Sequence, residues 1–138
     1  ICITGSACVG VSLNPHKNLS PFRPKSDIDV AIISSYHFEI AWKTLRHLRL
    51  ADAATPIERQ VLTDQQTYVY WGTIATDKIA RFLPFGSAWT VGLSQMKIEK
   101  PTEGRELKFR IYRDYDALRA YQIRSVQAIR AALLEISQ

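Results

Sequence analysis

The chain has 138 residues, of which 46% are hydrophobic and 22% are charged. This length and this balance are typical of one globular domain with a buried core, and they exclude a disordered segment or a collagen-like repeat. The 18 Lys and Arg residues against 13 Asp and Glu residues give a formal charge of +5. This excess of positive charge favours polyanionic partners, such as nucleotides, nucleic acids or a membrane surface.

The apolar runs and the cysteines bear on where the protein resides. The longest apolar runs, such as residues 30–33, are far shorter than a bilayer-crossing helix requires, so no transmembrane helix is expected. The two cysteines, Cys2 and Cys8, are too few for a disulfide framework and lack the spacing of a zinc site. Because the chain begins at Ile1 within an apolar run, no signal peptide is expected. We therefore expect a single cytoplasmic domain over residues 1–138, trimmed at its N-terminus.

The first third of the chain alternates between β-prone and polar stretches. Residues 1–4 predict a short strand, and residues 14–26, with three prolines and no carboxylate, predict a long loop. Residues 27–33 alternate at first and then become wholly apolar, which is typical of a strand entering a covered sheet. Apolar residues at helical spacing then predict a helix over residues 36–50.

The middle of the chain is less regular. Residues 67–71 are aromatic and β-branched, which predicts a strand. Thr76 and Asp77 predict the start of a short helix that ends before Pro84, and residues 84–87 predict a turn.

The last third contains the clearest alternation. It predicts a strand over residues 106–112, with the apolar residues Leu107, Phe109 and Ile111 on one face and the polar set Glu106, Lys108, Arg110 and Tyr112 on the other. From Asp114 to the end, helical spacing predicts a long helix with an apolar stripe of Leu118, Tyr121, Ile129, Leu133 and Ile136. The order of elements predicts an α/β fold, a small mixed sheet covered by helices.

Asp27 and Asp29 are the first candidates for chemistry. Side chains two apart on a strand point the same way, so these carboxylates would converge and repel each other. A cation would relieve the repulsion, and Mg²⁺ suits two carboxylates together with phosphate oxygens and water. The alternative is that Ser26 and Asp27 cap a turn while Asp29 faces solvent.

Gly5-Ser6 adds a second feature beside the carboxylates. A strand that ends in Gly-Ser offers backbone N–H groups at close approach and a hydroxyl, both of which can hold phosphate oxygens. If the end of this strand lies beside the start of the Asp-Ile-Asp strand, a phosphate-binding element stands next to a metal-binding one.

This arrangement resembles the signature of the nucleotidyltransferase superfamily, the polymerase-beta-like group. The signature is a hydrophobic residue, Gly-Ser and an interval, followed by Asp, a hydrophobic residue, Asp or Glu and another hydrophobic residue. The matching segments are residues 4–10 and 26–33. The resemblance implies a nucleotidyltransferase-like fold for the domain.

The resemblance also implies roles for four residues. Gly5 and Ser6 would hold the triphosphate of a nucleotide such as ATP. Asp27 and Asp29 would bind two Mg²⁺ ions that align the attacking hydroxyl and stabilise the departing pyrophosphate. The implied third carboxylate is expected on a later strand, where Glu106 is the one acidic residue on the polar face.

Basic residues surround these positions in the sequence. Lys108 and Arg110 can meet the phosphates or an RNA acceptor, or they belong to a solvated face. The unusually long interval after Gly-Ser forms an inserted loop whose Lys17, Arg23 and Lys25 contact phosphates or solvent.

A second Gly-Ser at residues 86–87, followed by Asp114 and Asp116, mimics the same formula. Because a helix-favouring run follows these acids, we expect Asp114 or Asp116 to cap the last helix.

Two functions follow as expectations. The first is a Mg²⁺-dependent nucleotidyltransferase that moves a nucleoside monophosphate from a nucleoside triphosphate to an acceptor hydroxyl. The acceptor is an RNA, a protein or a small molecule, and no membrane is involved. The alternative is a catalytically silent domain that binds nucleotide or nucleic acid as a sensor or partner module, which the basic pair of Lys108 and Arg110 favours.

Overall fold

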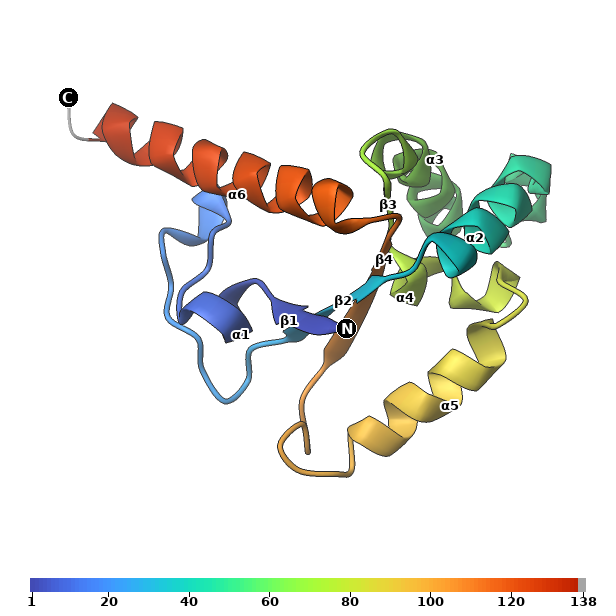
Figure 1. The fold of residues 1–138 in the computed structure, drawn as a ribbon, viewed down its shortest axis with the longest axis horizontal. Helices are drawn as coiled ribbons and strands as arrows, with labels where there is room; N and C mark the ends of the chain where they lie inside the picture. The colour runs from blue at the N-terminus through green and yellow to red at the C-terminus, as the bar shows by residue number, and fades with distance from the viewer. Residues whose placement is uncertain (137–138) are drawn as a thin grey trace.

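Strand β2 (Ile28–Ile33) lies at the centre of the fold in the computed structural model, which describes residues 1–136 (Figure 1). It pairs antiparallel with β1 (Cys2–Thr4) and parallel with β4 (Leu107–Tyr112). The short strand β3 (Thr73–Ile74) pairs antiparallel with β4, so the strand order is β1-β2-β4-β3. The expected α/β class with a small mixed sheet is confirmed.

Helices connect and cover these strands. They are α1 (Ser6–Val9), α2 (Ser35–His47), α3 (Pro56–Tyr70), α4 (Thr76–Ile79), α5 (Gly86–Met96) and α6 (Tyr115–Ile136), with short 3₁₀ turns η1 (Pro15–Lys17), η2 (Leu50–Asp52) and η3 (Ala80–Phe82). Parallel strands require a long crossover, and α2 to α5 lie within the one that joins β2 to β4. No helix within residues 1–136 has both the length and the apolar character needed to cross a membrane.

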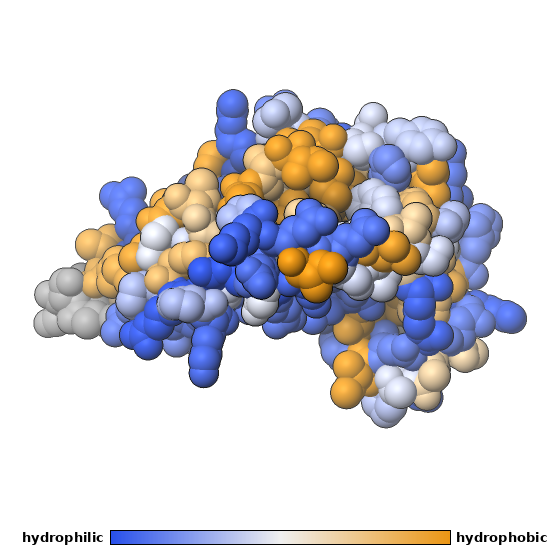
Figure 2. All heavy atoms as spheres, turned by 90° about the horizontal axis from the view of Figure 1, so that it is seen from below, coloured by the Kyte–Doolittle hydropathy of each residue, from blue (hydrophilic) through white to orange (hydrophobic). Residues whose placement is uncertain are grey.

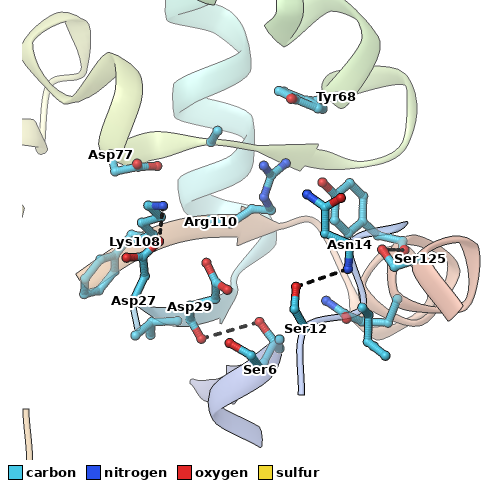
Figure 3. Close-up of a pocket in the computed structure, with 18 of the residues that line it drawn as sticks. Ser6, Ser12, Asn14, Asp27, Asp29, Tyr68, Asp77, Lys108, Arg110 and Ser125 are labelled. Carbon is cyan, nitrogen blue, oxygen red and sulfur yellow. Dashed lines mark hydrogen bonds and ion pairs between the residues drawn. The ribbon is translucent and has the colours of Figure 1, made fainter. Parts of the chain in front are cut away.

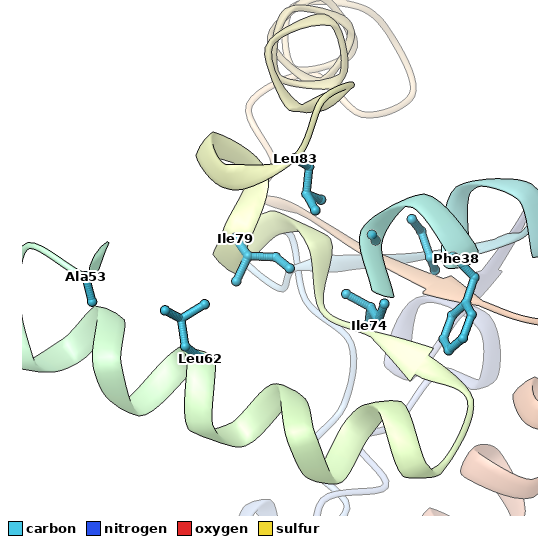
Figure 4. Packing of buried hydrophobic residues seen from close by; sticks show 8 residues of the cluster. Phe38, Ala53, Leu62, Ile74, Ile79 and Leu83 are labelled. Carbon is cyan, nitrogen blue, oxygen red and sulfur yellow. The ribbon is translucent and has the colours of Figure 1, made fainter. Parts of the chain in front are cut away.

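The main core lies between one face of the sheet and helices α2 to α4 (Figure 4). Its buried residues are Phe38, Ala41, Ala53, Leu62, Ile74, Ile79, Leu83 and Ile111. A second cluster on the same face joins Ile28 and Val30 of β2 to Leu107 and Phe109 of β4. The alternation expected for residues 106–112 is therefore confirmed on its apolar side.

The opposite face of the sheet is covered only in part. Helix α6 packs through Ala117 on Ala31 and Tyr112, the far ends of β2 and β4. Tyr112 was expected on the polar face; it lies on that face but is only 2% exposed, because α6 covers it. Burial raises the pKa of Tyr112 to about 12.

Most of the other predicted elements are present. The strands expected over residues 1–4 and 27–33 correspond to β1 and β2, and the helix expected over 36–50 corresponds to α2. The loop expected over residues 14–26 contains η1 and no longer element. The short helix after Thr76 is α4.

The last helix starts as expected. Asp114 precedes α6, and its Oδ1 accepts a hydrogen bond of 2.7 Å from the Ala117 N–H. Residues 137–138, which the predicted helix included, lie outside the described residues, as does the side chain of Ile136.

The strand predicted over residues 67–71 is wrong, because these residues belong to α3 or follow directly after it. A capping box starts that helix: Thr55 Oγ1 accepts from the Glu58 N–H at 3.2 Å, and Glu58 Oε2 accepts from the Thr55 N–H at 3.3 Å. Pro56 then occupies the first turn, where it costs no hydrogen bond. A well-started helix therefore overrides the β propensity of its aromatic end.

The turn predicted over residues 84–87 is shorter than expected, because α5 begins at Gly86. A Cβ atom on Gly86 would lie 1.6 Å from the carbonyl oxygen of Ala80. The missing side chain therefore lets α5 pack directly against the backbone of η3.

Candidate functional site

A cleft of about 970 Å³ opens on the part of the sheet that α6 leaves uncovered (Figure 3). Strands β2 and β4 form its floor, and its walls come from the β1–α1 turn, the loop over residues 14–26, and helices α3, α4 and α6. The cleft gathers the residues that the sequence marks as chemical: Gly5, Ser6, Asp27, Asp29, Lys108 and Arg110 all line it. Glu106 does not belong to this lining.

Gly5 and Asp29 are in direct contact at one end of the cleft. The register of β1 and β2 places Thr4 opposite Asp29, so the Gly-Ser turn begins beside that carboxylate. Gly5 has φ of +64°, and a Cβ atom built on it would lie 2.5 Å from Asp29 Oδ2. Only glycine fits this conformation and this spacing without displacing the carboxylate.

Lys108 is a neighbour of both aspartates. On the neighbouring parallel strand it is directly opposite Asp29, and its ammonium group forms an ion pair with Asp27 Oδ2 (Figure 3). The hydrogen bond to Asp27 raises the pKa of Lys108. Burial raises the pKa of Asp29, and the charge of Asp27 adds to the rise, while Lys108 opposes it. The lysine thus relieves part of the repulsion that the sequence predicted.

The donor set of the cleft can be compared with what a metal ion requires. Within residues 1–136 no group of three or more His, Cys, Asp or Glu side chains is arranged to hold a metal. Mg²⁺ needs only one or two carboxylates when phosphate oxygens and water complete its shell. Asp27 and Asp29 therefore fit a Mg²⁺ ion that arrives with nucleotide phosphates, provided that Lys108 releases Asp27.

Asp77 is an acidic residue of the cleft that the sequence reasoning missed as a site residue. It lies in the first turn of α4, on the wall across from β4, and its side chain points toward Lys108 (Figure 3). Burial raises the pKa of Asp77, and Lys78, Arg110 and Lys108 oppose the rise. No local motif identifies Asp77, because only the packing of α4 against β4 brings it to the cleft.

Glu106, the expected third carboxylate, lies elsewhere. Its side chain is exposed just before β4, and its carbonyl oxygen accepts a hydrogen bond of 2.9 Å from the Ile28 N–H. Its charge contributes to the raised pKa of Lys108, after the contribution of Asp27. The structure therefore places Glu106 at the margin of the site and Asp77 within it.

Arg110 is held between two aromatic rings in the middle of the cleft. Its guanidinium carbon lies 4.6 Å from the ring centre of Tyr68 on α3 and 4.8 Å from that of Tyr121 on α6. Arg124 packs in the same way on Trp71, at 4.7 Å. Tyr68 and Trp71, two of the aromatic residues that suggested a strand, thus contribute a wall of the cleft.

The inserted loop also reaches the cleft. Lys17 and Lys25 line it, and the charge of Lys17 lowers the pKa of Asp29, although less than burial raises it. Arg23 is exposed and outside the lining, and its carbonyl oxygen accepts a hydrogen bond of 3.1 Å from Arg105 Nη1.

Comparison of the chain with protein-family models, with curated proteins and with solved structures finds no match. The geometry and charge of the cleft are therefore the basis on which a function is inferred.

Proposed function

We propose that the cleft is the site of a Mg²⁺-dependent nucleotidyltransferase, which moves a nucleoside monophosphate from a nucleoside triphosphate to an acceptor hydroxyl. The observation that carries the proposal is the contact between Gly5 and Asp29. This contact places a turn that can bind phosphate next to the Asp29 carboxylate. Burial disfavours the charged form of that carboxylate, and a nearby cation would stabilise it.

The proposed roles follow from where the residues lie. Gly5 and Ser6 hold the terminal phosphates, and Asp27 and Asp29 hold the two Mg²⁺ ions, which lower the charge on the attacking and leaving oxygens. The acceptor oxygen attacks the α-phosphorus, the bond from that phosphorus to the bridging oxygen breaks, and pyrophosphate leaves. The hydroxyl proton passes to a carboxylate of the cleft and then to solvent. Lys108, once released from Asp27, balances phosphate charge.

Asp77 is the better placed of the two acidic residues that can accept this proton or complete the acidic set. It lines the cleft, whereas Glu106 lies outside the lining. Its raised pKa also suits proton uptake. If this assignment is right, Asp77→Asn slows turnover far more than Glu106→Gln; the reverse result would restore Glu106 to the role expected from the sequence.

A catalytically silent binding module is the second candidate, and the Lys108 ion pair favours it. An ammonium group already paired with Asp27 reduces the need for a metal ion. Such a domain would bind nucleotide through Gly5 and the basic residues without transferring any part of it.

Product analysis separates the two candidates. With Mg²⁺ and a suitable acceptor, pyrophosphate release should match nucleotide consumption one for one and disappear in Asp29→Asn. Glu103→Gln is the matched control, because Glu103 is exposed and does not line the cleft. Orthophosphate as the main product would contradict the transferase. Nucleotide binding without turnover across RNA, protein and small-molecule acceptors would favour the silent module.

A further inference from the structure

The cleft continues beyond the carboxylates toward α6, into a part that we call the aromatic end. It consists of Tyr68, Trp71, Arg110, Tyr121 and Arg124, all of which line the cleft. These residues come from α3 or its C-cap, from β4 and from α6, so tertiary packing brings them together. In Figure 3, Arg110 points into the space between Tyr68 and α6, away from Asp27.

Arg110 has an unsatisfied hydrogen-bond donor at this end. Its Nη1 atom is buried and has no hydrogen-bond partner in the part of the chain that the structure describes. Tyr68 and Tyr121 contact the guanidinium through their rings and so fix its position. A fixed guanidinium donor that is buried without an acceptor is costly, and phosphate is an acceptor whose geometry matches it.

The charge of the cleft lining as a whole favours an anion with several phosphates. Arg124 on α6 and the loop residues Lys17 and Lys25 add three cations to the cleft lining. Asp64 also lines this region, and its Oδ1 accepts a hydrogen bond of 2.8 Å from Gln60 Nε2. Over the whole cleft, cations outnumber carboxylates by six to four: Lys17, Lys25, Lys78, Lys108, Arg110 and Arg124 against Asp27, Asp29, Asp64 and Asp77.

From this combination we propose that the aromatic end binds the end of a single-stranded nucleic acid, which is the acceptor of the transfer. Guanidinium groups meet backbone phosphates, and aromatic rings offer faces on which bases stack regardless of sequence. The inference rests on the proposed function, in which the nucleotide's own phosphates are held at the opposite end by Gly5 and Ser6. The arginines of the aromatic end therefore meet phosphates of a second molecule. A protein acceptor supplies neither bases nor a phosphate backbone.

Binding of a short oligonucleotide tests the proposal directly. Fluorescence anisotropy of a 5′-labelled single-stranded RNA with a free 3′-hydroxyl is measured with the whole chain, with and without Mg²⁺-ATP. Arg124→Ala should weaken binding about tenfold and reduce the slope of log K against log salt by about 0.7, since one phosphate contact is lost. Arg119→Ala, on the same helix but exposed and outside the cleft lining, should change the affinity less than about twofold.

A neutral substitution separates stacking from charge. Tyr68→Leu should weaken binding about tenfold, and because it removes a ring and no charge, it should change the salt slope less than Arg124→Ala does. Thermal unfolding of each variant checks that the fold is retained, and the exposed Arg124 provides a test that does not disturb the core.

The outcomes show whether the aromatic end binds an oligonucleotide or the base of the nucleotide. They also show whether this inference alone or the proposed function as well is wrong. Oligonucleotide binding that persists with saturating Mg²⁺-ATP supports a separate acceptor site. Competition between the two overturns it, because the aromatic end then holds the base of the nucleotide. Equal losses in Arg124→Ala and Arg119→Ala also overturn it. Nucleotide binding without oligonucleotide binding overturns this inference alone, and the absence of both overturns the proposed function as well.

Discussion

The two faces of the central strand pair, β2 and β4, differ in what they contribute. One face is apolar along its whole length and lies under helices from the crossover; its residues are Ile28, Val30, Ile32, Leu107, Phe109 and Ile111. The other face is divided. Near the start of the strands it carries Asp29, Lys108 and Arg110, and only its far end is covered by α6.

The difference separates stability from chemistry on the same two strands. Because the apolar face buries continuous hydrocarbon, it supplies most of the free energy that holds the strands together. The charged face then tolerates groups that burial disfavours, such as the Asp29 carboxylate, as long as cations stand nearby. The effect of a substitution on stability should therefore depend more on which face of the sheet the residue occupies than on which strand it belongs to.

The largest expected effect is on the apolar face. Ile111→Ala should lower the free energy of unfolding by about 2–5 kcal/mol, because Ile111 is 0% exposed and its loss leaves a cavity in the main core. Asp29→Asn on the opposite face should change it by less than about 1 kcal/mol. Urea unfolding of both variants measures the contrast, and equal losses would contradict the division between the faces.

A pair of glycines tests the cleft itself. Gly5 and Gly10 both have positive φ, but only Gly10 is left-handed, whereas Gly5, with φ of 64° and ψ of −152°, lies in a region that is essentially restricted to glycine. Substitution by Ala should therefore cost about 1–2 kcal/mol of stability at Gly10 and about 1–3 kcal/mol at Gly5. Only Gly5 has a neighbour, Asp29, in the space where the Cβ would stand; Gly10 has nothing within 4 Å. Gly5→Ala should therefore also abolish the stabilisation by Mg²⁺-ATP in a thermal-shift assay, whereas Gly10→Ala should keep it. Loss in both variants would remove the special role of Gly5.

Strands β1, β2 and β4 were predictable because their signal is local, whereas β3 was not predicted. Alternation over residues 106–112 fixes which side chains share a face, and the run over 27–33 marks a covered strand. The meeting of Gly5 with Asp29 followed from the sequence only as a condition, and the antiparallel pairing of β1 with β2 fulfils it. What these residues do stays a prediction.

The missing parts of the site depend on contacts that are distant in sequence. Asp77 reaches the cleft because Thr76 Oγ1 donates to the Phe109 carbonyl at 3.1 Å and thereby fixes the start of α4 on β4. Gln65 similarly ties α3 to the sheet, since its Oε1 accepts from the Ala75 N–H at 3.0 Å. Neither bond has a signature in the local sequence, so the aromatic wall and the acidic residue across from Lys108 could not be predicted.

The apolar residues of α6 are a feature whose burial periodicity alone does not determine. The expected stripe is only partly buried: Ile129 is buried, while Leu118 and Tyr121 are half-buried. Others on this helix, Ile123 and Val126, are about half exposed, and hydrophobic residues gather at the end of the molecule that leads to the C-terminus (Figure 2). Periodicity identifies a helix but not how much of it the body of the protein covers.

Helix α3, which contains most of the segment wrongly predicted as a strand, provides a prediction with a smaller effect on stability. Thr55→Ala removes the capping box of α3 and should lower the free energy of unfolding by about 1 kcal/mol. Thr63→Ala, in the middle of the same helix, removes only a hydrogen bond to the Arg59 carbonyl and should have less effect or stabilise slightly, because alanine is the better helix former. Guanidinium unfolding measures both. Equal losses would contradict the assignment of a special role to the cap of this helix.

The smallest expected effect is a pH dependence of the free energy of unfolding that arises from Asp29. It tests how far the neighbouring cations offset the effect of burial on this carboxylate. Burial raises the pKa of this carboxyl above its usual 3.8, so the folded state binds the proton more tightly than the unfolded state. The contribution of Asp29 to stability is therefore fully present below 3.8 and is lost as pH rises through the raised pKa. Asn does not titrate. The stability of Asp29→Asn relative to the wild type should consequently increase over that interval and then stay constant.

Asp114 gives the control of opposite sign for this measurement. The Ala117 N–H lowers the pKa of Asp114, so its contribution is present above 3.8 and is lost as pH falls through the lowered value. Urea unfolding without metal or nucleotide, from about pH 3 to about pH 7, should therefore give difference curves of opposite slope for Asp29→Asn and Asp114→Asn. Curves of the same slope would mean that Lys108, Arg110 and Lys17 outweigh burial at Asp29. The protein's own cations would then already balance the charge that a metal ion is proposed to meet, and the silent binding module would become the better account of the cleft.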